Sequence, residues 1–426
     1  MTVEILSIGE KIKRSRIYKG LTLKDICEDK ISVSKMSCIE NNKVEPERWI
    51  LDYISEKLQL DIKYLLHGVK DQLVDNIKKF KKCKENNEFY NEYFEDVLYN
   101  LEYAEKYKAY DLCCEIMHLL FSSYMFKRKF DELRTIIPRY YDLCKKGNEE
   151  FYQLRYYIDI ATYLALNGER TQAISYYNSA RNRLIELDLE DKTELIRATY
   201  NEASTYLMLE DYENVTKICS ELKGLVPYCE NETFKGTIFQ LFGLLALHMK
   251  NYKEFEEYKE EVYKYQKNTP ERYSTSLHNF GEILLKNKEY EKGKECIVES
   301  LKICPEDNKE KKCLLLVATI EVLIKNNLLE LAQEVSDELL NYAINLNSSN
   351  FIESAYYYKA ILLQIQGNYA MSETYMNLSL DVLLKCGSNN KLYKRYLEMG
   401  NMYHKLGDVS ESIKFFNLAL QLEKKI

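Results

Sequence analysis

Leu397–Leu420 reads LEMGNMYHKLGDVSESIKFFNLAL and contains two helical patterns separated by a short turn. Gly400 lies nine positions before Val409, the first residue after the turn, and a small residue there lets a second helix approach closely. Gly407 stands where the first helix must end. After the turn, apolar residues recur with the spacing of one helix face, at Ile413, Phe416 and Ala419. The segment therefore predicts a hairpin of two helices.

The same pattern recurs along the chain at a nearly constant interval. The first residues after the successive turns are separated by 40, 42, 40, 38, 39, 40 and 40 positions. These residues are Phe130, Arg170, Tyr212, Tyr252, Tyr290, Leu329, Tyr369 and Val409. The small residues that precede them include Ala161, Ala203, Gly243, Gly281, Ala360 and Gly400, and turn glycines stand at Gly168, Gly367 and Gly407. A constant interval over seven steps indicates a solenoid, in which each helix pair packs against its neighbours.

The hairpin pattern resembles the tetratricopeptide repeat, most clearly in Leu397–Leu420. The usual period of that repeat is about 34 residues, so the extra residues here must lengthen helices or loops. HEAT-type repeats share the longer period and remain the structural alternative, although the small residue, the tyrosine and the turn glycine favour the tetratricopeptide repeat. The resemblance implies an all-α fold in which residues 109–426 form a right-handed solenoid of eight or nine helix hairpins.

The composition agrees with a helical protein, because 426 residues include only 5 prolines and 14 glycines. No apolar span is long enough to cross a membrane, and the first 30 residues lack a leader with a cleavage site. The 12 cysteines are scattered without a C-x-x-C pair or histidines at the spacing of a zinc site. We therefore expect a cytoplasmic protein with reduced thiols, no membrane contact, no metal and no cofactor.

The charge is unevenly distributed along the chain. The net charge of -7 argues against a protein that binds nucleic acid over its whole length. Residues 1–70, however, hold 13 lysines and arginines against 11 aspartates and glutamates. Any contact with nucleic acid is therefore expected in this first segment.

Residues 8–67 predict five short helices, and the third begins in ISVSKMSCIENNK, Ile31–Lys43. Thr22 and Ser32 are placed to cap the second and third helices. In the third helix, Met36 and Ile39 form the buried stripe, which leaves Val33, Ser34, Lys35 and Cys38 facing outward. Asn42 falls at a turn that needs positive φ, and Pro46 is expected to begin the fourth helix.

This segment resembles the five-helix, lambda-repressor-like helix-turn-helix domain. The resemblance rests on IGEKIKRSRIYKGLTLKDIC and SKMSCIENNKVEPERWILDYISEKLQL. It implies that the third helix enters the DNA major groove and that Arg16 and Glu40 form a structural, buried ion pair. The residues expected to contact DNA are Lys24, Val33, Ser34, Lys35, Ser37, Asn41 and Lys43. The outward face is poor in Arg, Gln and Asn, so specificity is expected to depend partly on dimer spacing and DNA shape.

A helix-turn-helix head on a tetratricopeptide array resembles the RRNPP family of peptide-pheromone receptors in Gram-positive bacteria, which includes PlcR-like and PrgX-like regulators. The resemblance implies a quorum-sensing transcription regulator that binds double-stranded promoter DNA, is switched by a short signalling peptide in the concave groove of the array, and acts as a homodimer. Residues 1–70 would be the DNA-binding domain, residues 71–108 a linker helix with an atypical first hairpin, and residues 109–426 the peptide receptor.

An extended peptide leaves backbone N–H and C=O groups unpaired, and Asn and Gln side chains can satisfy both. Such residues recur near the small residue on the first helix of successive hairpins. The candidates for peptide binding are Asn201, Asn279, Gln240, Tyr200, His278, Tyr357, Asp159 and Asn401. Arg155 and Arg197 are expected to bind a carboxylate of the peptide.

Two other functions stay open at this point. Some relatives of these receptors are Rap-like phosphatases or anti-activators of response regulators, and a tetratricopeptide array can also serve as a protein scaffold. The sequence has no glycine-rich phosphate loop, nucleophile elbow or cluster of histidines, so we expect no enzymatic activity.

Overall fold

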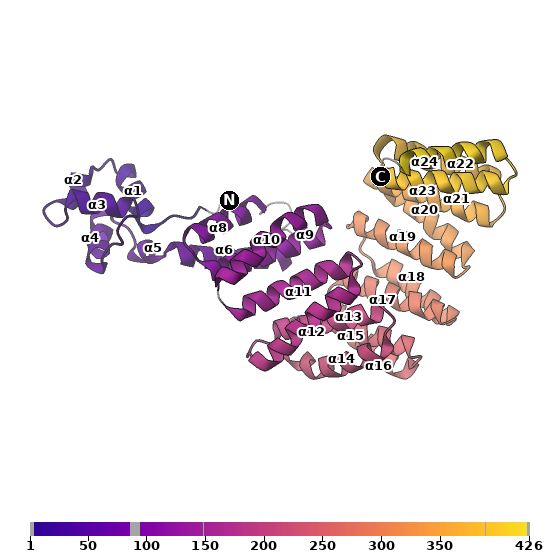
Figure 1. The fold of residues 1–426 in the computed structure, drawn as a ribbon, viewed down its shortest axis with the longest axis horizontal. Helices are drawn as coiled ribbons and strands as arrows, with labels where there is room; N and C mark the ends of the chain where they lie inside the picture. Colours follow the sequence, from indigo (N-terminus) through magenta and orange to yellow (C-terminus); the bar gives the residue numbers. More distant parts are fainter. Residues whose placement is uncertain (1–3, 86–93, 148, 388, 424–426) are drawn as a thin grey trace. The chain divides into compact units, whose positions relative to one another are not determined.

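The computed structural model describes residues 4–85, 94–147, 149–387 and 389–423, and within them every regular element is a helix (Figure 1). The expected linker and first hairpin at 71–108 therefore lie partly outside the described residues, over 86–93. The chain divides into two compact units, Met1–Leu222 and Lys223–Ile426. Across the described residues, no helix has both the length and the apolar character needed to cross a membrane.

The first five helices share one apolar core. They are α1 (Ile8–Tyr18), α2 (Leu23–Cys27), α3 (Val33–Glu40), α4 (Arg48–Leu58) and α5 (Ile62–Leu66). Their core includes the buried side chains of Ile12, Ile26, Met36, Ile39 and Ile54. The stripe predicted for α3 is therefore the face that packs inward.

The predicted helix caps in this segment are confirmed. The hydroxyl oxygens of Thr22 and Ser32 accept hydrogen bonds from backbone N–H groups in the first turns of α2 and α3. Asn42 has a φ of 57°. The start predicted for α4 is wrong by two residues, because the backbone stays extended through Glu47 and the helix begins at Arg48.

Two helices follow the first five, α6 (Val69–Glu85) and α8 (Phe94–Lys106). A buried hydrogen bond of 2.9 Å from Asn76 Nδ2 to Asn100 Oδ1 joins them. The segment before α1 is attached to α6, since the Gln72 side chain accepts from the N–H of Leu6 at 3.1 Å and donates to its carbonyl at 2.8 Å.

Helix hairpins make up the rest of both units. The first unit contains α9 (Tyr110–Phe126), α10 (Phe130–Gly147), α11 (Glu150–Leu166), α12 (Arg170–Leu187), α13 (Thr193–Met208) and the start of α14 (Tyr212–Leu225). The second unit contains the short helix η1 (Val226–Tyr228), α15 (Glu232–His248), α16 (Tyr252–Gln266), α17 (Pro270–Lys286), α18 (Tyr290–Ile303), α19 (Lys309–Lys325), α20 (Leu329–Leu346), α21 (Ser349–Ile365), α22 (Tyr369–Cys386), α23 (Asn389–Lys405) and α24 (Val409–Glu423). Each of the eight residues predicted to follow a turn is the first residue of a helix. The predicted all-α repeat fold is thereby confirmed.

The small residues on the first helices permit the close packing that the sequence predicts. A Cβ atom on Gly281 would lie 2.8 Å from the Ile297 side chain, on the second helix of the same hairpin. A Cβ on Gly400 would lie 2.7 Å from the ring of Phe416, again on the paired helix. Both distances are shorter than a normal carbon–carbon contact, so these positions exclude larger residues without a shift of the neighbouring helix.

All eight turns share one backbone conformation. The residue two positions before each second helix has positive φ, whether or not it is glycine. These residues are Arg128, Gly168, Glu210, Lys250, Lys288, Asn327, Gly367 and Gly407. A single left-handed residue therefore sets the turn in every hairpin, and the three glycines seen in the sequence are the unstrained cases.

Candidate functional site

The position of α3 is fixed by close contact with α1. A Cβ atom on Gly9 would lie 2.2 Å from the carbonyl oxygen of Ile39 and 2.7 Å from the Asn42 Oδ1 atom. Only glycine therefore allows the backbone of α1 to approach the end of α3 at this point.

The predicted ion pair between Arg16 and Glu40 is confirmed. Arg16 Nε and Nη2 donate to the two Glu40 carboxylate oxygens at 2.7 and 2.8 Å, and Nη1 donates to the carbonyl of Leu21 at 2.9 Å. The side chains are 14% and 3% exposed. The hydrogen bond with Glu40 raises the pKa of Arg16. This bidentate pair ties α1 to α3 and to the turn before α2, so its role is structural.

The residues predicted to contact DNA lie on the outer side of α2, α3 and the turn that follows. Val33 and Ser34 are exposed at the start of α3, and Lys24 is exposed on α2. Asn41 and Lys43 are exposed after α3, while Ser37 is half-buried. Asn41 Nδ2 donates to the carbonyl of Ser37 at 2.8 Å, which holds the end of α3. Most of these residues are therefore open to solvent, and Ser37 less so; their contact with DNA stays a prediction.

Lys35 has two partners that the sequence analysis did not identify. Its Nζ atom lies 2.7 Å from Glu47 Oε1 and 5.8 Å from the centre of the Trp49 ring. Trp49 Nε1 donates to the other carboxylate oxygen of Glu47 at 2.8 Å. Glu47 and Trp49 come after the turn that follows α3, twelve and fourteen positions beyond Lys35, and no periodic pattern links them to the helix face.

A chain of ion pairs joins the first helices of three successive hairpins in the first unit. Arg155 on α11 pairs with Glu115 on α9 and, at 2.7 Å, with Glu194 on α13. Arg197 on α13 lies 2.7 Å from Glu194 and 2.7 Å from Asp159 on α11. The Arg155 side chain is 12% exposed. Both arginines therefore already pair with carboxylates of this chain, and their binding of a peptide carboxylate stays a prediction.

Asp159 is buried at the centre of this chain, which corrects its assignment to the peptide surface. Its carboxylate lies 2.7 Å from His118 Nδ1 and accepts a hydrogen bond of 2.9 Å from the Tyr140 hydroxyl. Burial alone would raise the pKa of Asp159, but attraction to His118 and Arg197 holds that pKa well below its ordinary value. Asp159 is thus a charged group that already has three partners inside the protein: His118, Tyr140 and Arg197.

The chain of ion pairs has a signal in the sequence. Arg155 follows Glu115 by 40 positions and precedes Glu194 by 39, which is one repeat period in each direction. Residues one period apart on first helices lie side by side in a repeat array, so opposite charges at that interval indicate a contact.

The other candidates for peptide binding differ in how much surface they offer. Asn201 and Tyr200 on α13 are half-buried, and Asn201 Nδ2 donates to Thr162 Oγ1 at 3.3 Å. In the second unit, Gln240 and Asn279 are half-buried and Asn401 is exposed.

Two candidates are more enclosed than the sequence suggests. His278 is 5% exposed, which corrects its placement on the surface, and its burial lowers its pKa. The Tyr357 hydroxyl donates to Glu398 at 2.9 Å, and the Arg395 guanidinium lies 3.6 Å from the centre of its ring. Burial and Glu398 raise the pKa of Tyr357. Tyr357 is therefore held between two first helices.

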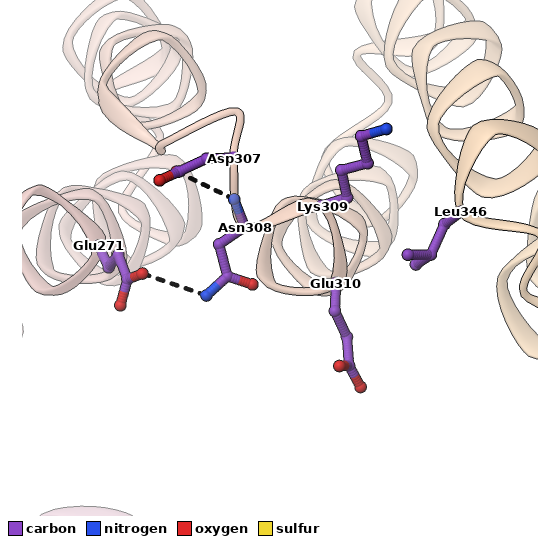
Figure 2. Close-up of a pocket in the computed structure, with 6 residues that line it drawn as sticks. All are labelled: Glu271, Asp307, Asn308, Lys309, Glu310 and Leu346. Carbon is purple, nitrogen blue, oxygen red and sulfur yellow. Dashed lines mark hydrogen bonds between the residues drawn. The ribbon is translucent and has the colours of Figure 1, made fainter. Parts of the chain in front are cut away.

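A shallow pocket of about 460 Å³ lies in the second unit, before the start of α19 (Figure 2). Its lining includes Glu271, Asp307 and Asn308. Asn308 Nδ2 donates to Glu271 at 3.1 Å, its backbone N–H donates to Asp307 at 3.0 Å, and its Oδ1 caps α19. The polar groups that line the pocket therefore serve to cap α19. None of the predicted site residues lines this pocket.

Two further observations concern the chemistry of the described residues. In this part of the chain, no three His, Cys, Asp or Glu side chains are grouped so that they could hold a metal ion. The cysteines whose side chains are described form no disulfide bonds.

Comparisons with known proteins give a repeat family and several similar structures. The family model described as tetratricopeptide repeat matches residues 274–307 and 393–426. No curated protein matches the chain. The chain is similar to PlcR of Bacillus thuringiensis, solved with the peptide PapR7 and DNA, at 19% identity over 61% of this chain and 94% of that one, with a TM-score of 0.38.

Two other solved structures are similar to most of the chain. One is the quorum sensor NprR from B. thuringiensis without ligand, at 16% identity over 84% of this chain and 100% of that one, with a TM-score of 0.46. The other is aspartyl phosphate phosphatase F from Bacillus subtilis, at 14% identity over 99% and 95%, with a TM-score of 0.42. The match of the family model decides between the two repeat types: the hairpins α17–α18 and α23–α24 are tetratricopeptide repeats.

Proposed function

We propose that the protein is a transcription regulator whose residues 1–70 bind duplex promoter DNA through α3 and whose repeats at 109–426 bind a short linear signalling peptide. In this proposal residues 71–108 connect the two functions, and the protein acts as a homodimer. The observation that carries the DNA-binding part is the outward face of α3, which presents small side chains and Lys35 on a helix held rigidly from behind.

The packing behind α3 supports this assignment. Gly9 and the buried Arg16–Glu40 pair hold α3 without using any group on its outer face. Val33 and Ser34 are short side chains, so the helix backbone can come close to base edges. Lys24 and Lys43 are exposed and can neutralise phosphates. A repressor-type head commonly binds paired half-sites, which supports the homodimer.

The peptide-binding part is supported by carboxamides on first helices. Asn201 in the first unit, and Gln240 and Asn279 in the second, keep part of their surface exposed. A carboxamide offers one acceptor and two donors, so it can pair with a peptide backbone whatever the side chains of that peptide.

The single tryptophan of the chain gives a direct test. Trp49 stands beside Lys35, so its fluorescence should change when duplex DNA binds at α3. The full-length protein would be used to enrich duplexes from a randomised pool, and the enriched duplex would then be titrated at several salt concentrations. We expect a change in Trp49 fluorescence and an affinity that falls steeply with salt. If no duplex is enriched and Trp49 does not respond, the DNA-binding proposal is wrong.

A further inference from the structure

Lys35, the cation at the centre of the outward face of α3, is already paired in the free protein. Its Nζ atom is 2.7 Å from the Glu47 carboxylate, whose second oxygen accepts from Trp49 Nε1 at 2.8 Å. The hydrogen bonds from Lys35 and then Trp49 lower the pKa of Glu47. The carboxylate is therefore charged at neutral pH and has a defined orientation toward Lys35.

The pair is also accessible to a large partner. The Lys35 and Glu47 side chains are 37% and 60% exposed, and Trp49 is 46% exposed. Glu47 is the residue before α4, yet its side chain makes no capping hydrogen bond to that helix. Its carboxylate thus hydrogen-bonds to Lys35 and Trp49 and not to the first turn of α4.

We propose that Glu47 is a specificity-determining residue of the DNA-binding surface, an inference that rests on the function proposed above. Binding without sequence preference is driven by phosphates and counterion release. A DNA phosphate and the Glu47 carboxylate are both solvated anions. Lys35 therefore gains little binding free energy when it leaves Glu47 for a phosphate. A guanine O6 and N7 edge in the major groove offers two acceptors at a fixed position, so a Lys35 contact there distinguishes one base from another, which a phosphate contact cannot do. Glu47 therefore withholds Lys35 from phosphates and releases it to the correct base.

A second effect acts in the same direction. The Glu47 carboxylate is a negative charge beside the helix that faces DNA, so it repels the phosphate backbone at any sequence. Removing this charge should strengthen binding to every duplex, and most of all to duplexes for which Lys35 has no base partner.

The test compares Glu47→Gln with Glu45→Gln in the full-length protein. Glutamine keeps an oxygen that can accept from Trp49, so the substitution removes only the charge and the ion pair. Glu45 lies in the same loop, is exposed, and has no ion-pair partner among the described residues. Both substitutions remove one negative charge near the DNA. Glu45→Gln therefore controls for the effect of that charge alone.

Affinities would be measured for the duplex enriched by the wild-type protein and for a scrambled duplex of the same length and composition. We expect Glu47→Gln to tighten binding of the scrambled duplex about three- to fivefold at low salt. The slope of log affinity against log salt concentration should become steeper by about 0.9, as for one additional phosphate contact. The enriched duplex should change by less than about twofold, so the preference between the two duplexes falls. Glu45→Gln should shift both duplexes by the same, smaller factor.

Two results would overturn the proposal. If Glu47→Gln shifts both duplexes equally, as Glu45→Gln does, then the carboxylate only contributes long-range charge. If Glu47→Gln weakens the enriched duplex, then Glu47 itself accepts a hydrogen bond from a base, such as cytosine N4. Failure of the wild-type protein to enrich any duplex is a separate outcome, which removes the proposed DNA-binding function before the variants are compared.

Discussion

Arg197 on α13 and Asp159 on α11 stand 38 positions apart in the chain, and a charged hydrogen bond of 2.7 Å joins them. Arg155 extends the same connection to α9 through Glu115. Three first helices are thus held by a continuous set of opposite charges that excludes most solvent. Removing one member of this set should lower the stability of the fold, because its former partner stays buried without an opposite charge beside it.

Replacing Arg155 by methionine should lower the free energy of unfolding by about 3 kcal/mol. After the substitution, Glu115 still pairs with Lys81 and Glu194 still pairs with Arg197. The expected loss of stability therefore lies at the lower end of the range for breaking a buried ion pair. Urea unfolding followed by circular dichroism measures the change. The matched control is Arg183→Met, which breaks a solvent-exposed pair with Glu150 and should have little effect. Equal effects of the two variants would mean that burial does not govern the strength of these pairs.

Asp159 should make stability depend on pH in the acid range. Its folded-state pKa lies below the ordinary value of 3.8, so its contribution is complete above that pH and is lost as the pH falls through the folded-state pKa. Asp159→Asn should therefore be less stable than the wild type at pH 7, and the difference should shrink steadily below about pH 4. Urea unfolding at a series of pH values measures it. A constant difference down to pH 2 would contradict the assignment, and Asp131→Asn at an exposed position is the control.

Gly9→Ala should destabilise the first five helices by about 1–3 kcal/mol. The new methyl group would meet the backbone oxygen of Ile39, which cannot rotate away as a side chain can. Thermal unfolding measures the loss, and DNA affinity should fall with it because α3 must move. Gly68→Ala is the control, since its Cβ would meet only Asp71 Oδ2 at an ordinary 3.5 Å. Unchanged stability in Gly9→Ala would show that α1 and α3 can separate at no cost.

Lys35→Ala and Asn201→Ala should separate the two proposed binding activities. Lys35→Ala removes a cation and a base-contact candidate, so affinity for the enriched duplex should drop about tenfold while peptide affinity stays the same. Asn201→Ala should do the reverse. Fluorescence titration with DNA and calorimetry with a pool of short linear peptides give the two readouts. If Asn201→Ala leaves peptide affinity unchanged, the assignment of Asn201 to the peptide surface is wrong.

The helix starts could be predicted from the sequence because they depend on a repeated local pattern. A turn and an apolar stripe recur in each hairpin, and a small residue in six of the eight; the resulting starts at Phe130, Tyr252 or Val409 are those of the structure. The left-handed turn residue was visible only where it is glycine. At Lys250 and Lys288 the tertiary packing imposes the same φ on a residue that does not favour it, so composition gives no sign of it.

The candidate site was predicted less well, for a physical reason. Residue type and spacing place Arg155, Asp159 and His278 on the correct helices, but they do not reveal the partners that those side chains already have. Those partners come from neighbouring hairpins, one period away in the chain. The pairing of Lys35 with Glu47 is harder still, since it crosses an irregular turn whose path depends on the packing of α4.

The uniform turn described above, with one left-handed residue two positions before each second helix, also makes the hairpins modular. Because the turn inside each of these eight hairpins has the same left-handed residue, removing one whole period between two such turns should rejoin equivalent backbone on both sides. A chain lacking residues 329–368, one interval between successive helix starts, should fold with a helical content reduced only in proportion to its length, as circular dichroism would measure. Length in such a protein can change by whole units, and a lineage could shorten or extend its repeat array without redesigning what remains.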